Sequence, residues 1–228
     1  MVAPAWPCRG CLGPLGAGAE AGLCARCWSG LVPLAEERCP RCALAHGGGA
    51  ACPEPVLWRL GDALWDYHGG LGALLVPAIK AGETGWLSAL LERVSRNRWP
   101  EFARTADLVC AVPTSWPRRW RRGFDLAEAA GALVAGRLGK PFRGLLRKAW
   151  FAPAQAGRSE SLRRRLPVNA IRPCRDRRLH GETVLLVDDV WTTGTTLARA
   201  ARALGGIGAG AVLVLALFRA CPATAKVL

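Results

Sequence analysis

The sequence is poor in acidic residues and has no long apolar run. Among 228 residues there are 17 Asp and Glu against 31 Lys and Arg, with one Met, one Tyr and three His. The longest clean apolar run, residues 208–218, has about half the length of a membrane-spanning helix. The first residues also lack a basic region followed by an apolar core, which argues against a secretory signal. We therefore expect a soluble, cytoplasmic protein with no membrane insertion.

The shortage of acids is concentrated in one part of the chain. Residues 114–180 hold 17 Lys and Arg against 4 Asp and Glu, whereas the net charge of the whole chain is +14. A concentrated basic segment is typical of a surface that binds a polyanion such as pyrophosphate, a nucleotide or nucleic acid. The alternative is a solvated basic surface without a specific ligand.

Cysteine is the residue in clear excess, and most of the ten cysteines fall within residues 1–57. That segment is otherwise filled with Gly, Pro and Ala, so it offers few bulky side chains for a core and needs a metal or disulfides to fold. In a reducing cytoplasm, paired CxxC motifs favour zinc over disulfides. We therefore predict two domains, a Cys-rich zinc ribbon over residues 1–57 and a second domain over residues 58–228.

The CxxC motifs fall into one complete and one incomplete set of metal ligands. The complete set is Cys8, Cys11, Cys24 and Cys27, which we predict to hold one zinc ion; the alternative is free or disulfide-bonded thiols. The incomplete set is Cys39, Cys42 and Cys52, with His46 as the local nitrogen ligand that would complete a second zinc site. The alternative for this second set is a decayed site with unmetallated thiols. Closed four-ligand zinc sites are structural, so we assign these residues to folding or docking rather than to catalysis.

The remainder of the chain has the pattern of an α/β domain. Apolar runs at 107–112, 184–187 and 211–217 predict buried strands, and residues 58–67 predict one or two more. Helical spacing lies between them, over 71–82, 86–98 and 126–138 and again from residue 197. This alternation predicts a parallel sheet flanked by helices, in which ligands bind at the carboxyl ends of the strands. Residues 150–173 have no sustained period and predict a long mobile hairpin or loop.

One stretch, residues 184–196, combines a buried strand, two acids and a Thr/Gly turn that leads into a helix. The acids are Asp188 and Asp189, placed where a ribose diol or a magnesium ion would approach. The turn consists of Thr192, Thr193, Gly194, Thr195 and Thr196. Backbone N–H groups at a helix N-terminus, together with hydroxyls, favour a bound phosphate. The alternative is a strand edge with solvated acids and a Thr-rich helix cap.

A second loop is predicted to lie at the same sheet edge, after the strand at 107–112. It carries four arginines within five positions, Arg118, Arg119, Arg121 and Arg122. Their planar guanidinium groups suit phosphate oxygens and cannot pack together in a core. The sheet topology therefore brings two anion-binding loops together.

Residues 184–196 resemble the signature of the type I phosphoribosyltransferases. The whole chain resembles the ComF family, which joins a zinc ribbon to a phosphoribosyltransferase-like domain and is associated with natural competence and DNA uptake. The CxxC repeats, Tyr67 before a helix ending at Lys80, the run into Arg122-Gly123-Phe124 and the acid pair carry this resemblance. Within the signature, Trp191 stands where the family commonly has an aliphatic residue.

The resemblance implies a role for each part of the site. Asp188 and Asp189 would contact the ribose diol of phosphoribosyl pyrophosphate, directly or through Mg²⁺, and the Thr/Gly turn would surround its 5′-phosphate. The Arg loop and Lys80 would lie on the pyrophosphate side, and residues 155–165 would close over the site. The first function hypothesis is thus an enzyme that binds phosphoribosyl pyrophosphate and transfers its phosphoribosyl group, in DNA uptake or in nucleotide metabolism. The alternative is a non-catalytic competence factor that handles single-stranded DNA. A third hypothesis makes the ribbon an adaptor that recruits a competence helicase or a membrane uptake machine.

Overall fold

The computed structural model describes residues 7–34, 36–46, 51–52, 56–81, 85–94, 99–114, 123–148 and 171–220. The elements in chain order are α1 (Ala25–Ser29), β1 (Leu31–Pro33), β2 (Leu60–Gly70), α2 (Gly72–Lys80), α3 (Gly85–Glu92), α4 (Glu101–Arg104), β3 (Leu108–Ala111), α6 (Leu126–Leu138), β4 (Leu146–Lys148), β5 (Ile171–Pro173), β6 (Thr183–Trp191), α8 (Thr195–Gly205) and β7 (Ala211–Arg219).

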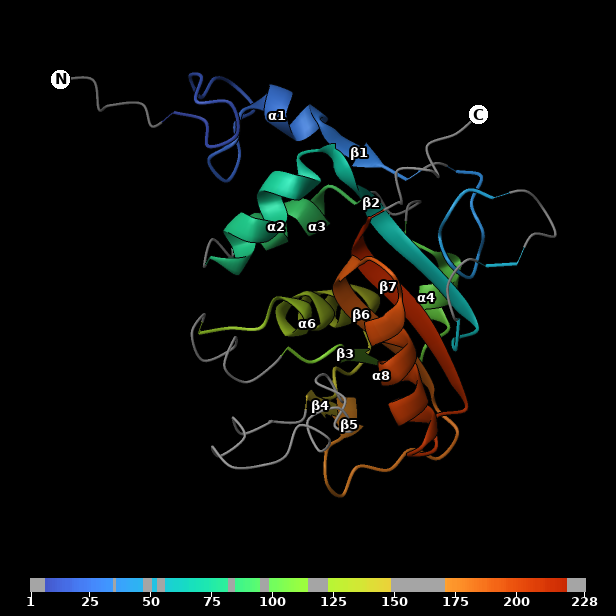
Figure 1. Ribbon diagram of the computed structural model, residues 1–228. Helices are drawn as coiled ribbons and strands as arrows, with labels where there is room; N and C mark the ends of the chain where they lie inside the picture. The colour runs from blue at the N-terminus through green and yellow to red at the C-terminus, as the bar shows by residue number, and fades with distance from the viewer. Residues whose placement is uncertain are drawn as a thin grey trace, which may run out of the picture.

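The main sheet has five strands in the order β1-β2-β7-β6-β3 (Figure 1). β2, β7, β6 and β3 are parallel, and β1 pairs with β2 in the antiparallel direction. β4 and β5 form a separate two-stranded sheet. The predicted parallel sheet flanked by helices is confirmed.

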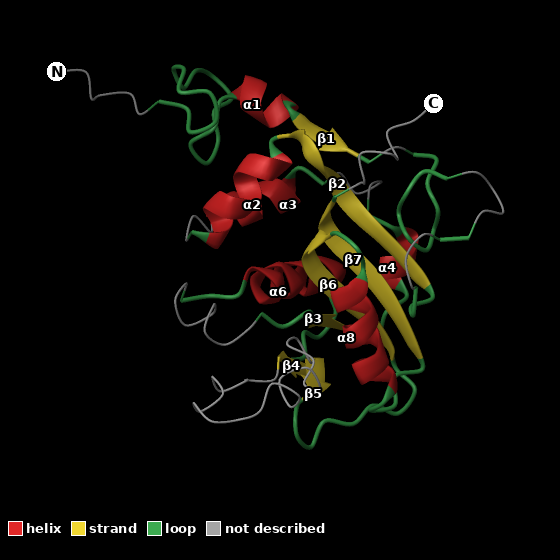
Figure 2. Ribbon diagram, viewed as in Figure 1, coloured by secondary structure: helices red, strands yellow, loops and turns green. Residues whose placement is uncertain are grey.

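The central strands are apolar along most of their length because both faces of the sheet are covered (Figure 2). In β6, Leu185 and Val187 belong to the core that includes α2, α3 and α6, whereas Val184 and Leu186 belong to the core that includes α8. This alternation follows from the two-residue period of a strand. In parallel sheets of this kind, ligands bind beyond the carboxyl ends of the strands.

β3 lies at one end of the sheet, whereas the apolar run at 107–112 suggested a central strand. It pairs with β6 on one side, and residues 141–143 run along its other side. There the N–H of Val109 donates to the carbonyl of Pro141 at 2.9 Å, and the N–H of Arg143 donates to the carbonyl of Val109 at 2.9 Å. Residues 141–143 thus cover the outer edge of β3, which explains why its apolar sequence resembles that of a central strand.

β6 is longer than predicted and continues through both acids to Trp191. Its pairing with β7 persists as far as Trp191 opposite Arg219, so the ladder includes both acids, which the sequence placed just after the buried run. α8 correspondingly begins at Thr195, two residues earlier than its apolar spacing suggested. α6 agrees with prediction: Asp125 caps it, and Gly139 ends it in the left-handed conformation.

The Cys-rich segment packs against the rest of the chain on both faces of the sheet. Leu23 and Trp28 join the core that contains α2 and α3, while Leu34 and Leu44 join the core that contains α8. β1, between these two parts, extends the main sheet by pairing with β2. The division into domains at residues 1–57 and 58–228 stays a prediction.

Candidate functional site

The acid pair lies near the carboxyl end of β6, beside a lysine from α2. Asp188 is buried, and burial raises the pKa of its carboxyl well above the usual range, with the charge of Asp189 adding to the effect. Asp189 is partly exposed, and its Oδ2 lies 2.5 Å from Nζ of Lys80. The structure thus brings Lys80, the last residue of α2, to the two carboxylates that the sequence singled out. A buried carboxyl of this kind is available to a cation or to hydroxyl donors.

The Thr/Gly turn joins β6 to α8 and leaves a helix N-terminus open. Gly194 adopts φ 69°, a left-handed conformation that glycine reaches without strain, and thereby reverses the chain into the helix. In the described part of the chain, no side chain caps α8. The four threonines of the turn are exposed, and the Oγ1 atoms of Thr193 and Thr195 lie 3.0 Å apart. Hydroxyls and the first N–H groups of the helix therefore face the same solvent-accessible space.

The carboxyl end of β3 reaches the same edge of the sheet. The N–H of Val112 donates to the carbonyl of Val187 at 2.9 Å, which places the start of the Arg loop beside the end of the acid-bearing strand. Asp125 caps α6 and also accepts hydrogen bonds from the N–H of Thr114, at 2.8 Å, and from its hydroxyl, at 3.1 Å. This buried carboxylate therefore ties the two sides of the Arg loop together.

Two predicted parts of the site lie outside the described residues. They are the arginines of the Arg loop, Arg118, Arg119, Arg121 and Arg122, and the predicted closing loop at 155–165. Their roles stay predictions.

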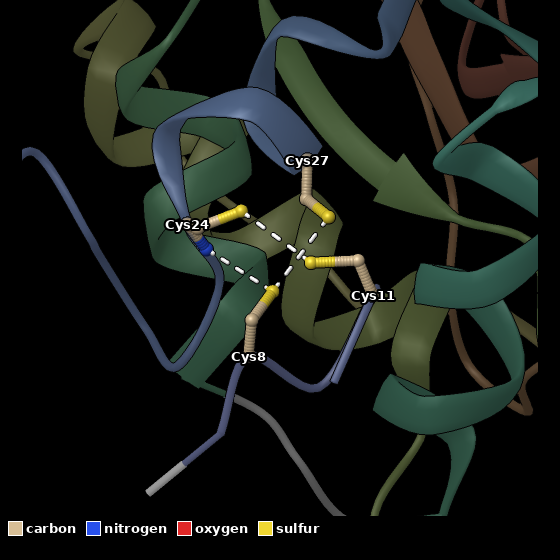
Figure 3. Close-up of side chains that lie close together, drawn as sticks. All are labelled: Cys8, Cys11, Cys24 and Cys27. Carbon is tan, nitrogen blue, oxygen red and sulfur yellow. Dashed lines mark hydrogen bonds between the residues drawn. The ribbon is translucent and has the colours of Figure 1, made fainter. Parts of the chain in front are cut away.

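The first Cys cluster brings Cys8, Cys11, Cys24 and Cys27 together, with all four sulfur atoms within 4.8 Å of one another (Figure 3). Sγ of Cys8 lies 3.6 Å from Sγ of Cys27, and Sγ of Cys11 lies 3.8 Å from Sγ of Cys24. A zinc–sulfur bond of about 2.3 Å gives a tetrahedral edge of about 3.8 Å, whereas a disulfide would need about 2.05 Å. The spacing therefore fits one tetrahedral zinc ion and not disulfides.

Backbone donors favour the thiolate form in this first cluster. The N–H of Cys24 donates to Sγ of Cys8 at 3.2 Å, and this bond is the main reason that the pKa of Cys8 falls to about 6. Burial raises the pKa of Cys27 to about 12, a cost that a bound cation would remove. One sulfur is thus prepared as a thiolate, which is the form that binds metal.

The second Cys cluster includes the histidine proposed to complete it. Sγ of Cys39, Sγ of Cys42, a ring nitrogen of His46 and Sγ of Cys52 lie within 4.8 Å of one another. Sγ of Cys39 lies 3.7 Å from Sγ of Cys52, and Nε2 of His46 lies 3.2 Å from Sγ of Cys42. Burial raises the pKa of Cys39, but the N–H groups of Arg41 and Cys42 outweigh it and lower the value to about 7. These four residues could hold a second zinc ion.

Sequence reasoning missed a buried arginine behind the Thr/Gly turn. Arg219 ends β7 and is fully buried, and its guanidinium donates to the carbonyls of Trp191 and Thr192. The sequence signal was a charge directly after the apolar run at 208–218, in a strand buried on both faces. A charge in that place needs buried partners.

A pocket of about 310 Å³ adjoins the start of the Arg loop. It lies between the carboxyl end of β3 and the β4–β5 sheet, and Thr114, Glu128, Phe142 and Lys148 are among the residues that line it. Its mixed lining of apolar and charged side chains is typical of small-molecule sites.

Among the residues that the structure describes, no helix has the length and apolar character that crossing a membrane requires.

Comparisons with known proteins agree with the α/β domain and with the Cys-rich segment. The phosphoribosyl transferase domain family matches residues 128–226. DNA utilization protein YhgH of Salmonella typhimurium is 31% identical over 209 residues, which cover 87% of this chain and 90% of the relative. The chain belongs to the ComF family. The protein of the same description from Escherichia coli K12 is 29% identical, with 94% of this chain and 96% of the relative covered.

Solved structures in the same comparison include the APRTase of Giardia lamblia, with a TM-score of 0.40 and 17% identity, covering 64% of this chain and 86% of that one. Scores this low support no further inference about this ComF-family chain.

Proposed function

We propose that this protein binds phosphoribosyl pyrophosphate, or a closely related ribose phosphate, at the carboxyl edge of its sheet. Asp188 and Asp189 hold the ribose diol. Thr192, Thr193, Gly194, Thr195 and Thr196 hold the 5′-phosphate. Lys80 and the arginines of the Arg loop, Arg118, Arg119, Arg121 and Arg122, face the pyrophosphate.

The observation that carries the proposal is the shared position of three anion-binding and diol-binding elements. Three different elements supply these parts: β6 carries the acid pair, α8 offers its open N-terminus and α2 ends at Lys80. Lys80 contacts Asp189, and the Thr/Gly turn begins three residues after Asp189. The uncapped helix end supplies backbone donors for a phosphate dianion. The carboxylates supply acceptors for two adjacent hydroxyls. A ribose 5-phosphate group has both a phosphate and two adjacent hydroxyls.

The acid pair also fits Mg²⁺ as a cofactor of binding. Two carboxylates at one strand end form an oxygen donor set of the kind that this ion prefers, and a nearby cation would offset the burial that raises the pKa of Asp188. Bound Mg²⁺ would shield the negative charge of the phosphates. The two Cys clusters fit structural zinc, which we propose for both.

Calorimetry with phosphoribosyl pyrophosphate and Mg²⁺ tests the proposal. The wild type should bind, and Asp188→Asn and Asp189→Asn should each lower affinity at least about tenfold, because each loses a carboxylate that bound Mg²⁺ would keep ionised. Asp176→Asn is the matched control: Asp176 is exposed at φ 58°, a conformation that asparagine tolerates well. Absence of binding by the folded wild type would overturn the proposal.

A second candidate function is the binding of single-stranded DNA, either in addition to binding a ribose phosphate or instead of it. The relatives of this protein are described as DNA utilization proteins. The described part of the basic segment also presents arginines to solvent on β4 and β5, where Arg147 and Arg172 lie opposite each other in the two-stranded sheet. Paired guanidinium groups suit a phosphate backbone. We accordingly propose a role in DNA utilization or uptake, with a competence helicase as a predicted partner and the cytoplasm as the predicted location.

A salt titration of single-stranded DNA binding tests this second function. Affinity should fall steeply with salt, and Arg147→Ala with Arg172→Ala should reduce the logarithmic slope by about 0.7 for each phosphate that is no longer neutralised. Arg93→Ala, on the other side of the sheet, is the control and should leave the slope unchanged. A slope that is shallow in the wild type would contradict DNA binding without affecting the ribose-phosphate proposal.

A further inference from the structure

Arg219 links the second Cys cluster to the Thr/Gly turn. Its Nε donates to the carbonyl of Cys42, a cluster residue, at 3.1 Å. Its Nη1 donates to the carbonyl of Trp191 at 2.9 Å and to that of Thr192. One side chain therefore holds a backbone carbonyl of the cluster and two backbone carbonyls at the start of the turn.

Two tryptophans form a second connection between the same parts. The ring of Trp191 packs edge-on against the ring of Trp58, with centroids 5.2 Å apart, and the guanidinium of Arg219 lies 4.6 Å from the Trp191 ring centroid. Nε1 of Trp58 in turn donates to the carbonyl of Arg41 at 2.7 Å, between Cys39 and Cys42. The Trp191 ring thus contacts Arg219 and Trp58, and Trp58 in turn bonds the cluster segment.

Gly61 shows how closely these parts meet. Its N–H donates to the carbonyl of Pro40 at 2.9 Å. A Cβ at this position would lie 2.6 Å from Nε1 of Trp58, 2.9 Å from the carbonyl of Arg41 and 3.1 Å from the Trp191 ring. No side chain fits where the cluster backbone, β2 and the end of β6 come together.

The burial of Arg219 gives the link its strength. A fully buried guanidinium requires partners for its N–H groups, and here the named partners are backbone carbonyls at fixed positions. If the Cys42 carbonyl moves away, a buried charged donor loses an acceptor, which costs more than an ordinary surface hydrogen bond. The position of the 39–42 segment and the position of the turn are therefore energetically coupled.

We propose that Arg219 is a positioning residue, through which the metal-bound second Cys cluster holds the Thr/Gly turn in its phosphate-binding conformation. The cluster does not touch the ligand; it sets the backbone at Trp191 and Thr192, from which the N-terminus of α8 follows. The consequence for ligand affinity rests on the proposed function, whereas the positioning of the turn does not.

Hydrogen exchange of the ligand-free protein tests the positioning directly. Arg219→Met should speed exchange at least about tenfold at the amides of residues 198–201, whose N–H groups form the first hydrogen-bonded turn of α8, because local opening then breaks fewer bonds. Arg93→Met is the matched control, since Arg93 also stacks on a tryptophan, 4.3 Å from the ring centroid of Trp28, but beside the first cluster. It should leave residues 198–201 at the wild-type rate. Unchanged exchange in a folded Arg219→Met protein would overturn the proposal.

Two further variants cover the case in which Arg219→Met does not fold. Arg219→Lys keeps the charge but loses the planar fork that spans two segments, so exchange at residues 198–201 should still rise. Cys52→Ser perturbs the link from the cluster side: zinc content should fall by one ion per chain, and the same amides should exchange faster. Zinc loss without faster exchange at residues 198–201 would overturn the proposal.

Calorimetry on the same proteins separates this inference from the proposed function. Arg219→Lys should weaken binding of phosphoribosyl pyrophosphate with Mg²⁺ about tenfold, the range in which outer-shell residues act. A wild type that does not bind overturns the proposed function alone, because the exchange result is read without ligand. Normal affinity in a variant whose turn exchanges faster would show that the turn does not hold the phosphate.

Discussion

The two Cys clusters look alike in sequence but lie on opposite faces of the sheet. Cys8 of the first cluster belongs to the core with α2 and α3, whereas Cys42 of the second belongs to the core with α8. The first cluster is held by α3, where Trp86 donates to the carbonyl of Ala21 and Arg93 pairs with Glu20 at 2.6 Å. The second is held by β2 and by Arg219, next to the Thr/Gly turn.

The contrast shows that two similar sets of metal ligands can support different parts of the fold. The bonds named for the first cluster reach α3 and Arg93, directly after it, so this cluster anchors the chain's first segment. The bonds that hold the second cluster reach the strand end that carries the candidate site. We therefore expect loss of a ligand in the first cluster to lower only the free energy of unfolding. Loss of a ligand in the second cluster should lower it as well and should also change the Thr/Gly turn.

The largest expected effect is the loss of a metal. Cys8→Ser and Cys42→Ser should each lower zinc from two ions per chain to one, with a loss on the order of 4 kcal/mol or more in the free energy of unfolding. Metal analysis and thermal melting measure both quantities. Hydrogen exchange then distinguishes the clusters, since residues 198–201 should lose protection in Cys42→Ser but keep it in folded Cys8→Ser. Equal protection in the two variants would contradict the claim that only the second cluster positions the turn.

A matched pair of glycines offers the next largest effect. An added Cβ would lie 2.8 Å from Sγ of Cys27 at Gly10, and 2.6 Å from Nε1 of Trp58 at Gly61. Gly10→Ala and Gly61→Ala should each cost about 1–3 kcal/mol through overpacking. Denaturant unfolding measures this cost. Gly61→Ala should also weaken binding of phosphoribosyl pyrophosphate, and Gly10→Ala should not; the reverse result would contradict the assignment of the clusters.

A tryptophan pair gives a smaller effect. Trp86→Phe removes the donor to Ala21 at the first cluster, and Trp58→Phe removes the donor to Arg41 at the second. Each should cost about 1 kcal/mol, because a buried indole loses its hydrogen bond to a backbone carbonyl. Only Trp58→Phe should increase exchange at residues 198–201. An equal increase in both would mean that the turn senses overall stability rather than the second cluster.

The smallest effect concerns the acid pair itself, which contacts neither set of metal ligands. Burial raises the folded-state pKa of Asp188, so the folded protein keeps this proton at pH values where the unfolded chain has released it. The free energy of unfolding should therefore fall as pH rises from about 3.9 toward the raised folded-state pKa.

Asp188→Asn should remove that part of the pH dependence. It should raise stability near pH 7 by about 1 kcal/mol, or about 2–4 °C in Tm, when measured without Mg²⁺ or ligand. Zinc content should stay at two ions per chain. A lower Tm in this variant would show that Asp188 is ionised and stabilised by its surroundings.

Much of the α/β domain could be predicted because its signals are local. The apolar runs at 107–112, 184–187 and 211–217 all became strands, and Asp125 and Gly139 bound α6 as their capping preferences indicate. The ends of β6 were harder, because pairing with β7 extends a strand through acidic residues that alone suggest a turn. The position of β3 at the sheet's end was not predictable, since residues 141–143 cover its outer side as a strand would.

The candidate site also has parts that the sequence could predict and parts that it could not. Spacing alone identified Asp188, Asp189, the threonines and the two sets of metal ligands, because metal and phosphate sites need particular residue types at short intervals. The contact between Lys80 and Asp189 joins residues more than a hundred positions apart, and the resemblance to a family, rather than spacing, suggested it. The roles of the arginines at 118–122 stay predictions.

By itself, the sequence determined which chemical groups this protein carries: two sets of thiol-rich candidate metal ligands, a paired carboxylate and a Thr/Gly turn that leads into a helix. Only the tertiary structure decided how these parts are connected. It placed the two Cys clusters on opposite faces of the sheet, and it placed Arg219 between one of them and the turn. The physical reason is that ligand spacing is a local property of the chain, whereas the partners of a buried charge are set by the packing of distant segments.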